Sequence, residues 1–349
     1  MDTLERTVPL VRFRDEQIEM AHGAGGKVSR RLIEGLMLPL LANPALETLS
    51  DAAVFPFNGS RVATTADAFV VKPLQFPGGS IGELAVNGTV NDLAVSGARP
   101  LALMATFILE AGLSGNVLRG EVEAMAKAAR QAGVFVVGGD TKVVEHGCAD
   151  GMYISTFGFG EVNARVRLGA KEVREGDQVL LSGPIGDHGI TILLARGELD
   201  LEASLTSDTR PLTPFVDALI DAAADGLRWM RDPTRGGVAT ALNELVRESG
   251  LGIVVFEERI PVRNEVRGAC EILGLDPLHI ANEGQMLVVV SPERAEAALT
   301  AMRRTSGGEG ACCIGEVREK PQKTVLGVTT YGGSRVVDML VGDPLPRIC

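Results

Sequence analysis

The sequence predicts a mixed α/β (α+β) fold made of two domains and a flexible C-terminal tail. The 349 residues are enough for two domains of ordinary size. In both halves, short apolar runs of strand length alternate with amphipathic helical patterns. A polar link at residues 171–177, with the sequence KEVREGD, separates the halves. We therefore place the domain boundary there.

In the first half, helices are predicted after residue 27, over 114–132, and from an S-x-x-E capping box at Ser80 to Gly97. Strands are predicted over 61–66, 101–109, 134–137 and 152–159. In the second half, strands are predicted over 178–182, 253–256, 285–290, 312–317 and 324–328. Helices are expected from residue 190 and over 214–224, 238–248, 266–273 and 292–303.

Charge and cysteine content narrow the class of protein. The net charge of −11 argues against nucleic acid or an anionic membrane as the main partner. No apolar run approaches about 18 residues, and the N-terminal stretch has no signal-type core. The five cysteines form no C-x-x-C pair. We therefore expect a cytoplasmic protein with no membrane and no nucleic-acid partner.

The last eight residues, GDPLPRIC, end in a thiol at Cys349. Two prolines keep this stretch out of helix and sheet, and about ten extended residues reach roughly 30 Å. A thiolate is a strong nucleophile, so a mobile arm that ends in one can collect a group at one place and deliver it at another. An accidental surface cysteine is the alternative. Prenylation is excluded because it requires a cysteine four residues from the end.

Two glycine-containing motifs precede predicted helices. His22-Gly23-Ala24-Gly25-Gly26-Lys27 offers backbone N–H groups to an anion, although it lacks P-loop spacing. A flexible connection is the other interpretation of this motif. The segment 231–237, RDPTRGG, has the same form more weakly. His188, at the start of another helix, is left open between a nucleotide contact and a helix cap.

Acidic and amide side chains cluster at predicted strand ends and on one helix face. Four aspartates, Asp51, Asp67, Asp92 and Asp140, lie at strand ends or beside glycines. Four carboxylates brought together repel one another without a metal, so Mg²⁺ with a nucleotide is their natural occupant. Singly, each aspartate is more readily interpreted as a cap or turn residue. Asn87 and Asn91 share a helix face, which we expect to meet a polar ligand or another polar surface.

The chain resembles the superfamily of aminoimidazole ribonucleotide synthetase and selenophosphate synthetase, and within it the HypE family of carbamoyl dehydratases. The resemblance spans almost the whole chain. Its motifs are HGAGG at 22–26, VNGTVNDLA at 86–94, GGDTK at 138–142, IGDHG at 185–189, RDPTRGG at 231–237 and the specific PRIC at 346–349.

The resemblance implies an aminoimidazole ribonucleotide synthetase-like fold. Its parts are a glycine-rich segment and helix at 1–39, a dimerisation and ATP-binding domain at 40–165, a second α/β domain at 172–335, and a mobile tail at 336–349. It implies a homodimer. It also implies ATP-dependent dehydration of a carbamoyl group on Cys349 to a thiocyanate. That thiocyanate would supply cyanide to the iron of [NiFe] hydrogenase.

The resemblance also implies roles for residues and partners. Lys142 and Glu283 would form the proton relay beside Cys349. ATP would be bound by His22, Gly25, Gly26, Asp67, Asn91, Asp92, Asp140 and Thr141, and Mg²⁺ by Asp51, Asp67, Asp92 and Asp140. The carbamoyltransferase HypF would load the thiol, and a HypC–HypD complex would receive the cyanide.

Two other functions remain open at this point. A different ATP-dependent enzyme of the superfamily would act on a small molecule, but it would have no use for a terminal thiol. A selenophosphate synthetase would need a cysteine in the first glycine loop, and the chain has none before Cys148. A nucleotide-binding carrier would hold a group on Cys349 without turning ATP over.

Overall fold

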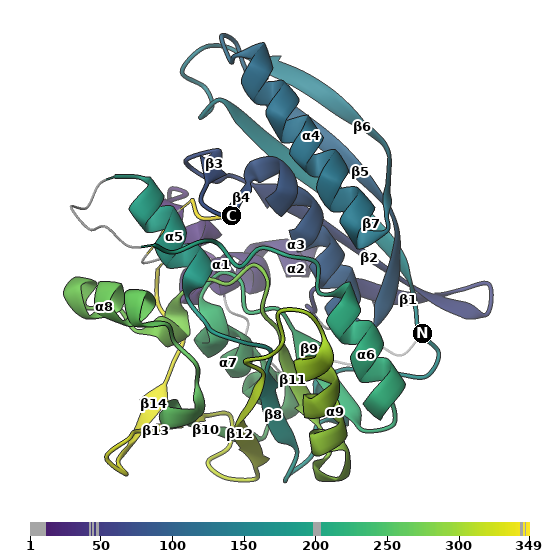
Figure 1. Cartoon of the computed structure of the whole chain (residues 1–349), viewed down its shortest axis with the longest axis vertical. Coiled ribbons are helices and arrows are strands. Elements are labelled where there is room, and N and C mark those ends of the chain that lie inside the picture. Colours follow the sequence, from purple (N-terminus) through teal and green to yellow (C-terminus); the bar gives the residue numbers. More distant parts are fainter. Residues whose placement is uncertain are drawn as a thin grey trace.

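The computed structural model describes residues 12–41, 43, 45–46, 49–197, 204–342, 345 and 347–349. It confirms the mixed α/β fold, with a larger sheet in each half and helices packed on both (Figure 1). No helix among the described residues is long and apolar enough to cross a membrane.

The N-terminal sheet has the strand order β1-β2-β7-β5-β6. These strands are β1 (Ala53–Phe57), β2 (Ser60–Phe69), β7 (Met152–Val162), β5 (Ala98–Glu110) and β6 (Phe135–Val144). Helix α3 (Ile81–Val95) packs on one face, and α4 (Gly115–Ala132) packs against α3 and lies over that face (Figure 1). A short hairpin of β3 (Gln75–Phe76) and β4 (Gly79–Ser80) precedes α3. Helix α3 begins where predicted, but the Ser80 side chain makes no capping hydrogen bond.

The C-terminal sheet has seven strands in the order β14-β13-β10-β12-β8-β11-β9. They are β14 (Ser334–Val337), β13 (Val325–Val328), β10 (Gly252–Phe256), β12 (Cys312–Arg318), β8 (Gln178–Leu181), β11 (Leu287–Val290) and β9 (Leu227–Arg231). Alternate side chains of the central strands point to opposite faces. One face packs on α7 (Gly237–Ser249), and the other packs on α6 (Thr213–Ala223) and α9 (Pro292–Arg304).

The remaining helices lie near the junction of the two halves. They are α1 (Lys27–Leu32), which continues through a π-helical stretch (Ile33–Met37) into α2 (Leu38–Leu41), then α5 (Asp187–Ala195) and α8 (Asn264–Leu273). Short 3-10 turns are η1 (Met20–Gly23), η3 (Ala170–Glu172), η4 (Glu257–Arg259) and η5 (Pro277–His279). One apolar core joins α3, α5, α8 and the tail residues Leu345 and Ile348. The tail is therefore built into the junction between the domains.

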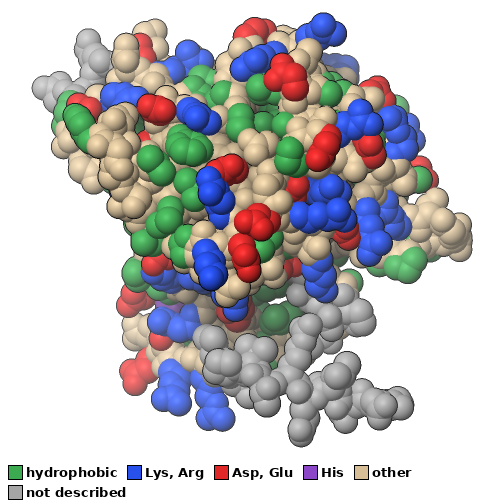
Figure 2. Space-filling model, turned by 90° about the horizontal axis from the view of Figure 1, so that it is seen from below, with side chains coloured by type: hydrophobic (Ala, Val, Ile, Leu, Met, Phe, Trp, Pro, Cys, Tyr) green, Lys and Arg blue, Asp and Glu red, His purple; other side chains and the backbone are tan. Residues whose placement is uncertain are grey.

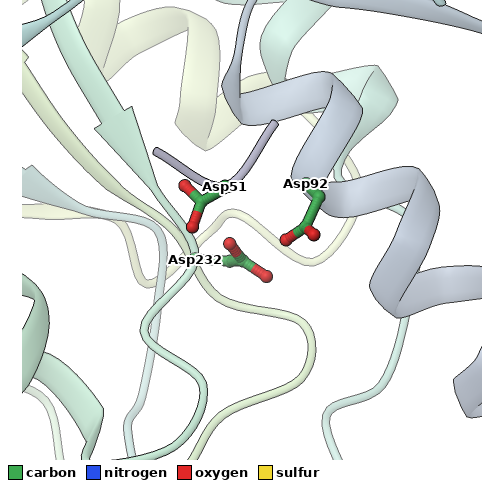
Figure 3. Close-up of side chains that lie close together, drawn as sticks. All are labelled: Asp51, Asp92 and Asp232. Carbon is green, nitrogen blue, oxygen red and sulfur yellow. The ribbon is translucent and has the colours of Figure 1, made fainter. Parts of the chain in front are cut away.

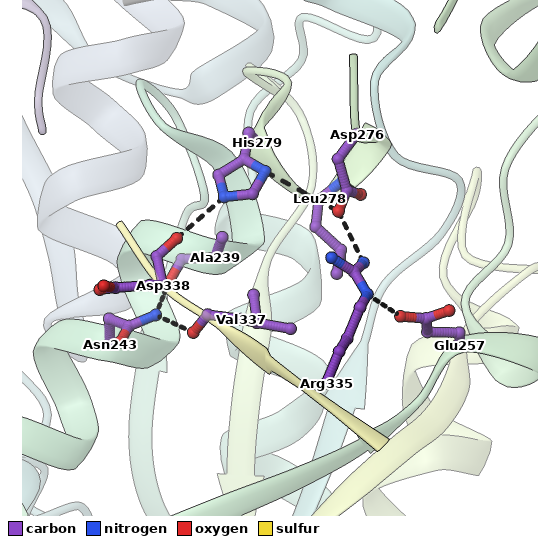
Figure 4. Close-up of polar contacts among 9 residues, drawn as sticks. All are labelled: Ala239, Asn243, Glu257, Asp276, Leu278, His279, Arg335, Val337 and Asp338. Atoms are coloured by element: carbon purple, nitrogen blue, oxygen red, sulfur yellow. Dashed lines mark hydrogen bonds and ion pairs between the residues drawn. The ribbon is translucent and has the colours of Figure 1, made fainter. Parts of the chain in front are cut away.

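Strand β14 is held at several points, so it belongs to the C-terminal domain (Figure 4). Arg335 pairs with Glu257 and Asp276 at 2.5 and 2.6 Å. Asn243 Nδ2 donates to the Val337 carbonyl at 2.9 Å, and His279 Nε2 lies 2.9 Å from the Asp338 carbonyl. The boundary predicted between 335 and 336 thus falls inside a strand. Strands β1 and β9 were likewise not predicted.

The face seen from below mixes basic and acidic side chains with apolar ones between them (Figure 2). No single sign of charge dominates that face.

Candidate functional site

Three aspartates from different elements converge on one point between the domains (Figure 3). Asp51 precedes β1, Asp92 lies on α3 and Asp232 follows β9 directly. Each offers a carboxylate oxygen, and these oxygens lie within 4.8 Å of one another. Among the described residues, no other set of three or more His, Cys, Asp or Glu side chains has this spacing. Oxygen donors of this kind suit a hard divalent cation.

Burial and mutual repulsion disfavour the ionised forms of the carboxyl groups in this cluster. Burial, and then the nearby carboxylates of Asp67 and Asp232, raise the pKa of Asp92 well above its usual range. Burial likewise raises the pKa of Asp232 to about 6. Arg231 Nε lies 2.7 Å from Asp51 Oδ1 and offsets part of the negative charge, but Arg231 is shared with Glu244 at 2.8 Å. Arg231 therefore offsets only part of the charge that the three aspartates carry when ionised.

Glu283 and Asp67 extend the acidic site. Asp67, near the end of β2, accepts a hydrogen bond from Thr89 at 3.4 Å and interacts with Asp92. Glu283 is 2% exposed, and its Oε1 has no hydrogen-bond partner among the described residues. Burial, and then Asp232, raise its pKa well above the usual range. A buried carboxyl group whose pKa is raised in this way is a candidate for proton transfer.

The structure places the 138–142 motif elsewhere. Strand β6 runs without a break through Asp140, Thr141 and Lys142, and all three are exposed. Lys142 Nζ pairs with Asp140 Oδ2 at 2.5 Å. Within one chain, then, Asp140 is not part of the acidic cluster, where Asp232 lies instead. Lys142 likewise does not meet the buried Glu283.

The first glycine loop is largely occupied by contacts within the chain. His22 is buried, with Nε2 2.9 Å from Asp15 Oδ2 and Nδ1 accepting from the Glu19 amide at 3.0 Å. The amide of Gly25 donates to Ser29 Oγ at 2.9 Å. A side chain at Gly26 would lie 2.5 Å from the Leu340 carbonyl, so the glycine allows close packing there. The loop offers an anion fewer N–H groups than its sequence predicts.

The polar face of α3 meets protein. Asn91 Nδ2 donates to the carbonyls of Arg210 and Glu283 at 3.0 and 3.2 Å, and its Oδ1 accepts from the Leu212 amide at 2.7 Å. Asn87 Nδ2 donates to a hydroxyl in the same loop at 3.2 Å. The expectation of a polar surface is confirmed. Asn91 acts as a bridge between domains in this structure, with its amide group fully used.

The C-terminal tail is docked against the segment that follows β2, and the C-terminus lies close to the β3–β4 hairpin (Figure 1). The C-terminal carboxylate of Cys349 accepts from the Val70 amide at 3.0 Å, and the Arg347 carbonyl accepts from the Lys72 amide at 3.3 Å. Ile348 is 3% exposed and its carbonyl lies 2.6 Å from His188 Nε2. His188 thus contacts the tail, a role that the sequence did not reveal. The prolines 344 and 346 lie outside the described residues.

Comparison with known proteins decides the family. Residues 49–162 match the model of the AIR synthase related protein N-terminal domain, and 174–327 match that of its C-terminal domain. The chain is 50% identical over 337 residues to the carbamoyl dehydratase HypE of Azotobacter vinelandii, covering 97% of this chain and 98% of that protein. The chain belongs to the HypE family of carbamoyl dehydratases. The resemblance seen in the motifs is therefore confirmed.

Solved structures of HypE proteins agree with this fold. One, from a HypE–HypF complex, has a TM-score of 0.84 and 44% identity, covering 88% of this chain and 99% of that one. Another HypE, solved in complex with ATP, has a TM-score of 0.80 and 45% identity, covering 95% of this chain and all of that one (100%).

Proposed function

We propose that this chain is an ATP-dependent carbamoyl dehydratase of [NiFe] hydrogenase maturation whose substrate is carried on its own Cys349. The observation that carries the proposal is the docked tail. The C-terminal carboxylate of Cys349 is bound by the Val70 amide, three residues after Asp67 on the same segment. A group on the thiol is thereby brought to the junction where the buried acidic residues lie.

The reaction converts the S-carbamoyl group to a thiocyanate. Amide oxygen is a poor leaving group, so it must first take the γ-phosphoryl group of ATP. The nitrogen then loses both protons, the carbon–oxygen bond breaks, and phosphate leaves with the oxygen. S-carbamoylcysteine and ATP thus give S-cyanocysteine, ADP and phosphate. Positioning and charge stabilisation at the phosphoryl group supply most of the catalysis in such transfers.

The acidic cluster fits Mg²⁺. Asp51, Asp92 and Asp232 would hold the ion, because three carboxylates within 4.8 Å of one another, one buried and two half-buried, have only part of their charge offset by Arg231. When bound, the ion would neutralise charge on the nucleotide phosphates. Asp67 is a further oxygen donor beside the cluster, since it interacts directly with Asp92.

We further propose a homodimer that completes the site. Strand β6 has an open edge among the described residues, and its Phe135, Val137 and Val143 are 76%, 64% and 68% exposed. Apolar surface of this kind favours pairing with a second copy. Lys142 of that copy would then reach Glu283, whose buried Oε1 has no partner within the described part of the chain, and the two would form the proton relay. Asp140 and Thr141 would reach the nucleotide by the same route.

The proposed reaction on the Cys349 thiol needs one protein to load the carbamoyl group and another to accept the cyanide. HypF would load Cys349 when the tail is outside the junction, and a HypC–HypD complex would accept the cyanide. A HypE–HypF complex is known for a relative. We place the reaction in the cytoplasm, where thiols stay reduced.

Intact-mass spectrometry tests the function. The chain is incubated with the carbamoyltransferase, carbamoyl phosphate and ATP. We expect one carbamoyl group on Cys349, followed by loss of one water only when ATP is present. An adduct that never loses water would support a carrier that does not turn ATP over. No adduct, with a transferase shown to be active on another acceptor, would refute the proposal.

A further inference from the structure

A buried histidine holds the backbone of the tail. His188 is fully buried at the start of α5, where its Nε2 lies 2.6 Å from the Ile348 carbonyl. A carbonyl only accepts, so Nε2 carries the proton in this contact. Burial lowers the pKa of His188 to about 4, so the ring is neutral at pH 7 and its Nδ1 must be an acceptor.

Ser207 supplies the matching donor. Its Oγ lies 2.8 Å from His188 Nδ1 and also accepts from the Thr209 amide at 3.1 Å. Because the amide can only donate, the hydroxyl proton is left to point at Nδ1. The hydroxyl therefore selects the tautomer that carries its proton on Nε2, which is the one that binds the tail.

The same loop also holds the turn that carries Glu283. The carboxylate of Asp208 accepts from the amides of Glu283 and Gly284 at 3.0 and 3.3 Å. Adjacent residues of one short segment thus have two roles. Ser207 supports the tail through His188, and Asp208 holds the turn that carries Glu283, the proposed proton-transfer residue. The same loop therefore positions both the tail and Glu283.

We propose that His188, with its tautomer set by Ser207, is a positioning residue that retains the carbamoylated tail in the site during dehydration. The inference rests on the proposed function, since retention matters only if chemistry occurs on Cys349. His188 touches the Ile348 backbone and not the reacting group, so it acts by raising the population of the docked tail.

Two readouts separate positioning from chemistry. The first is the alkylation rate of Cys349 in the unloaded chain, measured by peptide mass, with exposed Cys148 as the internal reference. The second is the single-turnover rate of water loss from the carbamoylated chain after ATP is added. In His188→Leu we expect Cys349 alkylation to rise about fivefold and water loss to slow by a similar factor, the equivalent of one hydrogen bond.

His188→Gln is the matched rescue variant, because its Nε2 amide retains a donor at the corresponding position. It should restore both rates to near those of the parent. Ser207→Ala leaves the ring in place and removes the tautomer control, so it should give the same changes to a smaller extent. It also serves as the deciding variant if His188→Leu fails to fold. Cys148 alkylation should be unchanged in all of them.

Equal Cys349 alkylation in the parent, in Ser207→Ala and in folded His188→Leu would overturn the inference. So would equal loss of rate in His188→Gln and His188→Leu. Failure of the proposed function gives a different pattern, because the parent itself would then lose no water while the alkylation differences persisted.

Discussion

Removing one carboxylate from the acidic cluster should stabilise the metal-free protein and abolish its response to Mg²⁺. The change is Asp92→Asn, which keeps the size of the side chain and an oxygen that can accept from Thr65 Oγ1, now 2.6 Å from Asp92 Oδ2. What it removes is the charge that repels Asp51 and Asp232.

The magnitude follows from the spacing. Two unit charges 4.8 Å apart, the limit of this cluster, repel by about 3 kcal/mol at an effective dielectric of about 20. Burial raises the pKa of Asp92 well above its usual range, which favours the protonated form and reduces the relief. We expect a gain of about 1–3 kcal/mol, and hence a melting temperature higher by roughly 2–6 °C in EDTA.

Fluorescence of the single tryptophan, Trp229 on β9, reports unfolding close to the cluster. Mg²⁺ with a non-hydrolysable ATP analogue should raise the melting temperature of the parent and leave that of Asp92→Asn unchanged. Asp221→Asn is the control, because it removes a carboxylate that is 80% exposed and paired only with Arg165 among the described residues. A metal-free Asp92→Asn protein less stable than the parent would refute the argument.

Three further predictions concern the tail, the dimer and pH. One extra residue after Cys349 should abolish water loss while ATP binding by calorimetry is retained; normal turnover would refute the docked-tail model. Lys142→Ala and Glu283→Gln should each be inactive, yet mixed dimers should regain dehydration if the relay crosses the dimer, and should stay inactive if it lies within one chain. Below pH 6.5, His188 becomes protonated in the unfolded state, whereas the buried ring of the folded state stays neutral down to about pH 4. The parent should therefore lose about 2 kcal/mol more stability than His188→Leu between pH 7 and 5 in urea unfolding, and parallel losses would exclude this linkage.

Most elements could be predicted because their patterns are local. Helix α4 shows amphipathic spacing and ends at Gly133, which adopts a left-handed conformation with φ of 69°. The shared face of Asn87 and Asn91 correctly indicated a polar neighbour. Strand β1 was missed because four of its five residues are exposed, so it has no apolar alternation to detect.

The site was harder to predict because a glycine can be required either by a ligand-binding loop or by close packing of two backbone segments. Gly138 and Gly139 suggested a ligand loop, but a side chain at Gly139 would lie 1.7 Å from the Ala105 carbonyl. That glycine is required by the close pairing of β6 with β5, next to an irregular register at Met104. Asp140 was predicted as a ligand in the place that Asp232 occupies, because only the tertiary fold decides which strand end faces the junction.

The tail contacts explain how a docked segment can also leave. Hydrogen bonds from Lys72, His188 and Arg196 go to backbone carbonyls of the tail, and one from Val70 goes to its C-terminal carboxylate. Together they are worth about 4 kcal/mol. Burial of the Leu345 and Ile348 side chains adds about 4 kcal/mol. Ordering a segment of eight residues costs about 8 kcal/mol or more of backbone entropy. Docking is therefore close to balance, so the loss of one contact, or a new group on the thiol, is enough to shift the tail between loading and dehydration.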